Sequence, residues 1–117
     1  MDKIYIRDLL VRCIIGVFEK ERDIKQDVVF NIVLHTDTTA AARSDDLADT
    51  VDYKDLRDRI IACVEPSSFR LIESLAEKVA AICLQSPLVE AVEVSVDKPG
   101  ALTVARSVAV EIRRPRA

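Results

Sequence analysis

The sequence has few of the residues on which most nucleotide, metal and cofactor sites are built. Of its 117 residues, two are glycine and one is histidine. Gly16 and Gly100 cannot form a dinucleotide-binding GxGxxG fingerprint or a phosphate-binding GxxxxGK[ST] loop. His35 stands alone, and no CxxC, HxxxH or HExxH spacing supplies zinc ligands. Rossmann, P-loop and zinc chemistry are therefore excluded, and we expect neither a metal nor an organic cofactor.

Cysteine, aromatic residues and long apolar runs are also scarce. Cys13, Cys63 and Cys83 each lie among apolar residues, so we expect them to be small core side chains. A net charge of −3 and 4% aromatic residues argue against a nucleic-acid surface. No apolar run approaches the ~18 to 20 residues that span a bilayer, and the N-terminus does not resemble a signal peptide. We expect a cytoplasmic protein that binds neither nucleic acid nor membrane.

The residues that are present indicate one folded unit. Half are apolar and 32% are charged, which excludes disorder for most of the chain. A length of 117 residues is close to that of a typical domain, so we expect a single domain over 1–117. His35 lies in an alternating segment, which favours a surface strand residue over a general base. The basic residues 113–117 are expected to form a solvated terminus.

Four segments are typical of β-strands. Residues 27–38 alternate clearly, with Val28, Phe30, Ile32 and Leu34 on one face. Segments 3–15, 90–97 and 104–112 are also rich in Val, Ile and Leu. The Pro99-Gly100 pair after the third segment is typical of a type II turn.

Two helices are expected between the second and third strands. Asp52 can cap the first helix, which keeps an apolar spacing through Val64 and stops at Pro66. The second runs over 71–85 and presents one apolar stripe. Residues 39–48 are expected to form a short helical connection before the first of these helices.

This element order predicts an α+β fold in which both helices cover one face of a four-stranded antiparallel sheet. The other face would carry Val29, Val33 and Ala91, which is more apolar than a solvated face requires. We therefore expect the sheet to continue into an oligomer.

Four titratable residues at turns and helix starts are candidates for a site. Glu21 follows Gly16 in a charged loop, where it could also be a solvated charge. Lys98 precedes the Pro-Gly turn; if partly desolvated it could transfer protons, and otherwise it is an edge lysine that prevents strand aggregation. Glu73, in the first helical turn, could hold a planar heterocycle together with free N–H groups, or only stabilise the helix dipole. Tyr53 could enter the same pocket, although packing against the sheet is favoured.

Together, several motifs resemble those of the dihydroneopterin aldolase family over nearly the whole chain. They are Ile15-Gly16-Val17 with Glu21, residues 44–53, Leu71-Ile72-Glu73 and Lys98-Pro99-Gly100-Ala101. The resemblance implies the tunnelling fold (ββααββ), in which strands continue around an oligomeric barrel and two rings stack as a homo-octamer. It implies a metal-independent retro-aldol reaction of folate biosynthesis, in which 7,8-dihydroneopterin yields 6-hydroxymethyl-7,8-dihydropterin and glycolaldehyde.

The same resemblance implies residue roles. Lys98 would assist proton transfer at the pterin ring nitrogen, and Glu21 would line the reaction centre and tune Lys98. Tyr53 of a neighbouring subunit would handle the protons of the side-chain hydroxyl and of the enol intermediate. Substrate-binding roles fall to four residues: Glu73, Ile72, Thr50 and Val51.

Two alternatives stay open. A dihydroneopterin triphosphate 2'-epimerase would share the glutamate, tyrosine and lysine, and reversible cleavage would allow an aldolase some epimerase activity. The run from Lys98 to Ala101 favours the aldolase, whereas Arg22 and residues 26–29 also fit the epimerase. The other alternative is a noncatalytic oligomeric domain that binds pterin without turnover.

Overall fold

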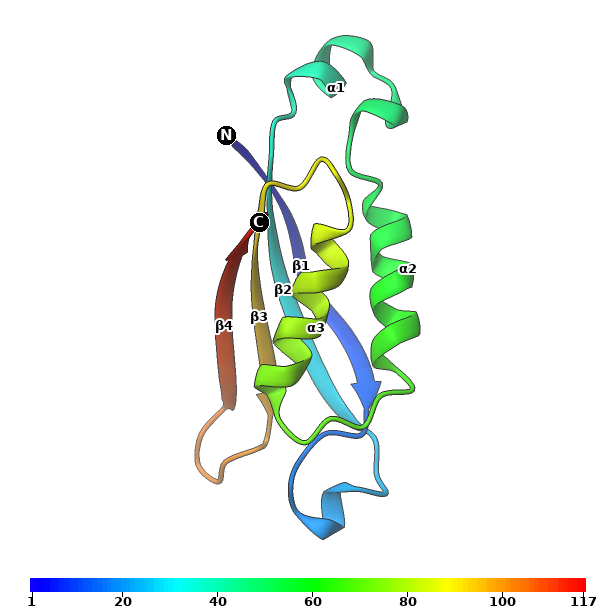
Figure 1. Cartoon of the computed structure of the whole chain (residues 1–117). Helices are drawn as coiled ribbons and strands as arrows, with labels where there is room; N and C mark the ends of the chain where they lie inside the picture. The colour runs from blue at the N-terminus through cyan, green and yellow to red at the C-terminus, as the bar shows by residue number, and fades with distance from the viewer.

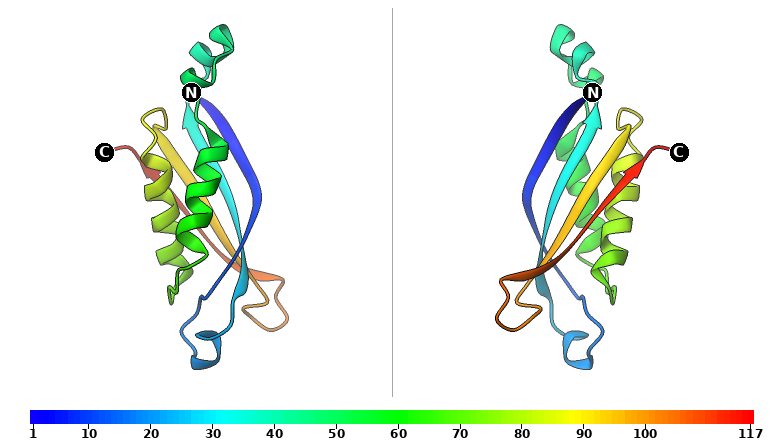
Figure 2. Two further views of the ribbon diagram at one scale, coloured as in Figure 1. Left: turned by 90° about the vertical axis from the view of Figure 1, so that its right-hand side faces the viewer. Right: turned by 90° about the vertical axis from the view of Figure 1, so that its left-hand side faces the viewer.

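The computed structural model describes all residues from 1 to 117 and consists of one sheet with helices on one face (Figure 1). The sheet is antiparallel and its strands follow chain order: β1 (Asp2–Cys13), β2 (Gln26–Thr36), β3 (Ala91–Pro99) and β4 (Ser107–Pro115). Two helices, α2 (Tyr53–Val64) and α3 (Ile72–Leu84), lie on the same side of it (Figure 2). The short helix α1 (Thr39–Ser44) projects beyond the end of the sheet. No helix combines the length and the apolar composition needed to cross a bilayer.

The predicted α+β class and the order of the long elements are confirmed. Asp52 caps α2 as expected, because its carboxylate accepts from the N–H of Asp55 at 3.0 Å. The predicted turn after Lys98 also forms: Gly100 has φ +73°, and the Ala101 N–H donates to the Lys98 carbonyl at 3.4 Å. The predicted start of the last strand was wrong. Val104 lies fully exposed in the β3–β4 loop with φ +62°, and pairing begins only at Ser107.

The core lies between the helices and one face of the sheet. The alternating residues of β2 are all buried beneath the helices: Val28, Phe30, Ile32 and Leu34. The predicted stripe of α3 is buried against them, which removes apolar surface from water and stabilises the packing. Cys13 and Cys83 are buried as expected, and burial raises the pKa of the Cys83 thiol to about 12. Cys63 is only half-buried, because it lies beside the apolar stripe of α2 rather than on it.

A β-bulge in β1 explains why this strand lacked a clear alternation. Ile6 pairs with Ile32 and Leu9 with Phe30, so two residues of β1 face one residue of β2. Asp8 sits in the bulge with φ +56°, and its N–H donates to the Asn31 side chain at 2.9 Å. The extra residue shifts the core-facing pattern from even to odd positions, so that three odd-numbered residues after the bulge face the core: Leu9, Val11 and Cys13.

We expect substitution of Asp8 to test the bulge. Asp8→Val should lower the free energy of unfolding by about 1–2 kcal/mol, because a β-branched residue fits the left-handed region poorly. Asp8→Asn should stay within about 0.5 kcal/mol of the wild type, since asparagine tolerates that region. Urea denaturation of both variants measures the difference. Equal stability of the two variants would contradict a strained bulge.

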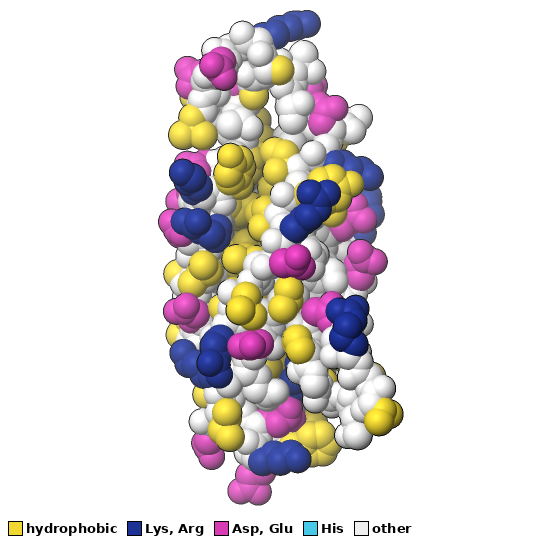
Figure 3. Space-filling view, turned by 180° about the vertical axis from the view of Figure 1, so that it is seen from behind, with side chains coloured by type: hydrophobic (Ala, Val, Ile, Leu, Met, Phe, Trp, Pro, Cys, Tyr) yellow, Lys and Arg dark blue, Asp and Glu magenta, His cyan; other side chains and the backbone are white.

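The face of the sheet away from the helices is a mixture of apolar and charged side chains (Figure 3). Tyr5 and Leu10 are 49% and 56% exposed there, while Val29 and Val33 are half-buried. His35 is a strand residue on this face, with its Nε2 2.6 Å from the Glu93 carboxylate. Ala91, expected to add to an exposed apolar surface, is instead 4% exposed.

The C-terminal residues are mostly exposed, as expected of a solvated terminus, but they are also bonded to the rest of the fold. β4 continues through Pro115, and the Arg116 N–H donates to the Glu90 carbonyl at 2.8 Å. The Arg116 side chain donates to the Val89 carbonyl, and Arg114 pairs with Glu77 of α3. The basic residues therefore fasten the last strand to the helix layer.

Candidate active site

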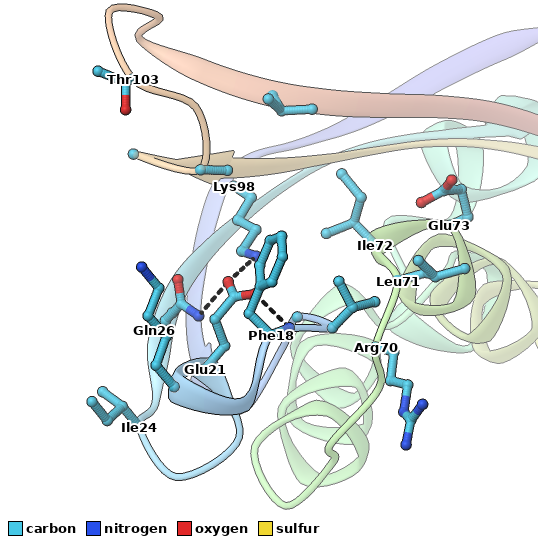
Figure 4. Close-up of a pocket in the computed structure, with 16 residues that line it drawn as sticks. Phe18, Glu21, Ile24, Gln26, Arg70, Leu71, Ile72, Glu73, Lys98 and Thr103 are labelled. Carbon is cyan, nitrogen blue, oxygen red and sulfur yellow. Dashed lines mark hydrogen bonds and ion pairs between the residues drawn. The ribbon is translucent and has the colours of Figure 1, made fainter.

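A pocket of about 660 Å³ opens at one end of the molecule, where three separate segments meet. The β1–β2 loop supplies one wall, the first turn of α3 a second, and the end of β3 with the following loop a third. Four residues predicted from the sequence line this pocket: Glu21, Ile72, Glu73 and Lys98 (Figure 4). They are up to 77 positions apart in the chain, so only the fold brings them together.

An ion pair between Glu21 and Lys98 forms the polar centre of the pocket. The Lys98 Nζ lies 2.7 Å from the Glu21 Oε2, and the two side chains are only 12% and 17% exposed. Lys98 is on β3, a central strand, so the interpretation as an edge lysine was wrong. The alternative interpretation of Glu21 as a solvated loop charge was also wrong, because its side chain is mostly buried and paired. The Lys98 Nζ can also donate to a basic atom of a ligand that is placed beside it.

Backbone geometry explains why Glu21 reaches the lysine. The chain turns at Gly16 with φ +133°, a conformation that residues other than glycine rarely adopt. The Glu21 carboxylate lies so close to Gly16 that a Cβ there would collide with it. The loop then closes through Phe18, whose carbonyl accepts from the Glu21 N–H at 2.9 Å. One of the two glycines in the sequence is therefore needed for the position of Glu21.

Hydrogen bonding keeps Glu21 ionised. The pKa of its carboxyl is lowered to about 2, mainly by the hydrogen bond from Lys98 and further by donors from Gln26 and the Phe18 backbone. Partial burial acts in the opposite direction and is outweighed. The carboxylate is therefore charged throughout the neutral range.

The lowered pKa predicts acid sensitivity. Protons bind the unfolded chain more readily than the folded one between the ordinary glutamate pKa of 4.5 and about 2. The free energy of unfolding contributed by Glu21 should thus be fully present above pH 4.5 and decline as the pH falls through this interval. Urea denaturation from about pH 6 to pH 3 should give a shallower decline for Glu21→Gln than for the wild type. Identical slopes would contradict the assignment.

Arg22 ties the Glu21 wall to the helix wall. Its guanidinium donates to the carbonyls of Gly16 at 2.9 Å and Phe69 at 3.2 Å, and also to that of Ser68. The Gly16 N–H donates to the same Phe69 carbonyl at 3.3 Å. Arg22 therefore sets the spacing between the β1–β2 loop and the segment that leads into α3.

The first turn of α3 offers the second polar feature of the pocket. Leu71 stands at the N-cap position without a side chain that caps the helix, so the first N–H groups of the helix have no acceptor within it. Glu73 is exposed beside them and is drawn across the pocket from Lys98 (Figure 4). A carboxylate next to free N–H donors can bind a flat heterocycle that presents donors and an acceptor on one edge.

The other predicted residues are not in this pocket. Tyr53 is the first residue of α2 and is 55% exposed, so the favoured packing against the sheet was wrong. It lines a different hollow together with Thr50, while the Val51 side chain is buried in the core. Because α2 and α3 run antiparallel (Figure 1), the start of α2 lies about one helix length, ~18 Å, from the start of α3. Within one chain, Tyr53 does not reach Lys98.

The sequence did not single out two residues that hold Glu21. Gln26 donates from its amide to Glu21, and Phe18 donates from its backbone. A glutamine at a strand start and a backbone N–H carry no recognisable pattern in a single sequence. Only the folded loop identifies them.

Residues 4–113 match the family model described as dihydroneopterin aldolase. The dihydroneopterin aldolase of Streptomyces coelicolor is 46% identical over 101 residues, which cover 86% of this chain and 85% of the relative. A dihydroneopterin triphosphate 2'-epimerase of Pseudomonas aeruginosa is 33% identical over 112 residues, covering 96% and 91%. Folic acid synthesis protein FOL1 of Dictyostelium discoideum is 40% identical over 114 residues, and the chain spans 17% of that longer protein.

A solved structure is similarly close. The crystal structure of Escherichia coli dihydroneopterin aldolase in complex with neopterin superimposes with a TM-score of 0.93 at 38% identity. The match covers 97% of this chain and 99% of that one. The similarity therefore extends over all three walls of the pocket and the whole sheet.

Proposed function

The chain belongs to the dihydroneopterin aldolase family and is a carbon–carbon lyase of folate biosynthesis, and we propose that its pocket cleaves 7,8-dihydroneopterin without a metal. The products are 6-hydroxymethyl-7,8-dihydropterin and glycolaldehyde. The observation that carries this proposal is the Glu21–Lys98 pair facing Glu73 across one pocket. The neopterin complex of the E. coli relative supports a pterin as the ligand of such a pocket.

The reaction needs proton transfer and orientation. The bond between the first and second side-chain carbons breaks, and the second carbon becomes the aldehyde as its hydroxyl loses a proton. The electron pair of the broken bond moves into the ring C=N bond, and the ring nitrogen takes up a proton. Protonation of the resulting enol at carbon, with release of the proton on nitrogen, gives the product. The pterin is its own electron acceptor, so no Schiff base is required.

The pocket residues fit these steps. Glu73 accepts from the amino and ring N–H groups of the pterin, and the N–H groups at Ile72 and Glu73 donate to its carbonyl. This places the ring nitrogen near Lys98, whose Nζ is held in position by Glu21 and donates the proton. The first turn of α3 therefore binds the pterin ring, and Lys98 at the end of β3 transfers the proton.

Completion of the site requires a second subunit. Both sheet edges, β1 and β4, are long strands without an outer partner, which favours continued pairing between chains in an oligomeric barrel. Adjacent subunits in such a ring would bring the α2 start of one chain toward the pocket of the next. Tyr53 would then relay the side-chain hydroxyl proton, giving up its own phenol proton as it takes this one, and the backbone at Thr50 and Val51 would contact the pterin. The expected assembly is a homo-octamer of two rings.

The direct test is incubation of chelator-treated protein with 7,8-dihydroneopterin, and separately with its triphosphate, under anaerobic conditions. Glycolaldehyde and 6-hydroxymethyl-7,8-dihydropterin from the free pterin, resolved by chromatography, are the expected products. An epimer formed chiefly from the triphosphate would assign the chain to epimerase activity, which its P. aeruginosa relative is named for. Pterin binding without any product would indicate a noncatalytic domain.

Variants at the two walls should separate binding from chemistry. Lys98→Ala should abolish cleavage, with kcat reduced by about 10²-fold or more, while pterin affinity is largely kept. Glu73→Ala should chiefly weaken binding, because the carboxylate that accepts from the pterin edge is lost. Steady-state kinetics and equilibrium titration measure both effects. Tight binding without turnover in Glu73→Ala would contradict this division.

A site shared between subunits predicts complementation. Lys98→Ala and Tyr53→Phe should each lose cleavage alone, but randomly mixed oligomers should regain up to about a quarter of wild-type activity, since some interfaces combine an intact lysine with an intact tyrosine. Mixtures of Lys98→Ala with Glu73→Ala are the control and should regain none, because both residues line the pocket of one chain. Mass spectrometry confirms subunit exchange. Lack of recovery in exchanged Lys98→Ala and Tyr53→Phe oligomers would exclude a shared site.

A further inference from the structure

We propose that Gln26 is a positioning residue of the site, whose side-chain amide holds the Glu21 carboxylate in the one orientation that aims the Lys98 ammonium into the pocket. This inference rests on the proposed function, because it assigns a catalytic consequence to that orientation. Gln26 itself is not a catalytic residue, since it acts through Glu21 and Lys98.

The contacts of the amide determine its orientation. Gln26 is the first residue of β2 and pairs with Cys13 of β1, so its backbone belongs to the rigid sheet. Its Nε2 donates to the Ile15 carbonyl at 2.9 Å and to the Glu21 Oε2 at 3.2 Å. Both acceptors lack a proton to give, so only the nitrogen of the amide can occupy this position, and its two N–H groups are both used.

The carboxylate of Glu21 is held from both sides. Its Oε1 accepts from the Phe18 N–H at 3.2 Å, and its Oε2 accepts from Gln26 and from Lys98. The terminal torsion of a glutamate is broad, so a carboxylate held by fewer donors rotates easily. The amide therefore connects the Oε2, and with it the Lys98 Nζ, to the sheet.

A neutral donor is required at this position. Glutamine adds a hydrogen bond without a second charge, so Lys98 stays the one cation that Glu21 pairs with. The other charged groups of the pocket come from two walls. Lys20 lies on the Glu21 loop, and Arg70 and Glu73 lie on the α3 side; Arg22 next to the loop is occupied by backbone carbonyls.

The expected consequence is a selective effect on chemistry. A proton donor displaced by ~1 Å can lower a rate by about 10²-fold, whereas the α3 wall that binds the ring is untouched. Gln26→Met keeps the length of the side chain but removes the donor. We expect kcat to fall by about tenfold with KM nearly unchanged, which is the loss of one neutral hydrogen bond.

Gln26→Glu gives a sharper signature. The introduced carboxyl can donate to Glu21 only while it is protonated, and once ionised it repels Glu21 and competes for Lys98. Its kcat relative to wild type should therefore fall as the pH rises through the range of glutamate titration. A purely steric role for Gln26 would give a ratio that does not change with pH.

The matched control is Arg22→Met, which releases the same loop without touching the Glu21 carboxylate. A ¹³C NMR titration of the Glu21 carboxyl is measured beside the kinetics, and it does not depend on turnover. Its midpoint should move upward in Gln26→Met and stay near the wild-type value in Arg22→Met, because only the former removes a donor that lowers the pKa of Glu21.

The outcomes distinguish this inference from the proposed function. A wild type that cleaves dihydroneopterin, with kcat lost in Gln26→Met and pH-dependent loss in Gln26→Glu, supports the positioning role. Unchanged kcat and an unchanged Glu21 midpoint in Gln26→Met would overturn it, whatever the wild type does. A wild type without turnover would defeat the proposed function and with it the catalytic role of Gln26, even if the midpoint still moved.

Discussion

The pocket depends on the contact between Glu21 and Lys98, because no other side-chain hydrogen bond or ion pair joins the β1–β2 loop directly to β3. Two opposite charges at 2.7 Å, mostly shielded from water, stabilise each other only if the remaining lone pairs of the carboxylate are also satisfied. The loop meets that requirement with a backbone N–H and an amide, and a glycine leaves the space in which the carboxylate sits. The result is a lysine side chain that is fixed in place before any substrate arrives.

The antiparallel helices determine how the rest of the site must be assembled. They cover the same sheet face and begin at opposite ends of it, so the residues at the start of α2 and those at the start of α3 are separated by a helix length. In the proposed ring, the exposed end of one subunit would complete the pocket of the next, and the open sheet edges would supply the pairing that closes the barrel.

Much of the fold was predictable because the apolar periodicity of each segment agrees with the cap and turn residues at its ends. The alternation in β2, the stripe of α3, the Asp52 cap and the Pro-Gly turn each lie where the sequence indicates. The sequence predicted β1 as a strand but not the register shift within it, because the bulge at Asp8 depends on the Asn31 side chain of the next strand. The start of β4 and the docking of Arg114 and Arg116 were missed, because they depend on partners in α3 and in the α3–β3 loop.

The amino-acid sequence by itself determined the fold class, the family and the candidates Glu21, Glu73 and Lys98. Residue type, local periodicity and the order of motifs are properties of the linear chain and require no knowledge of its packing. The confirmed family membership agrees with that resemblance. Only the tertiary structure decided which candidates share a pocket. Distances between residues far apart in the chain follow from packing, and this packing brings Glu21 to Lys98, leaves Tyr53 at the far end and places the Gln26 amide against the Glu21 carboxylate.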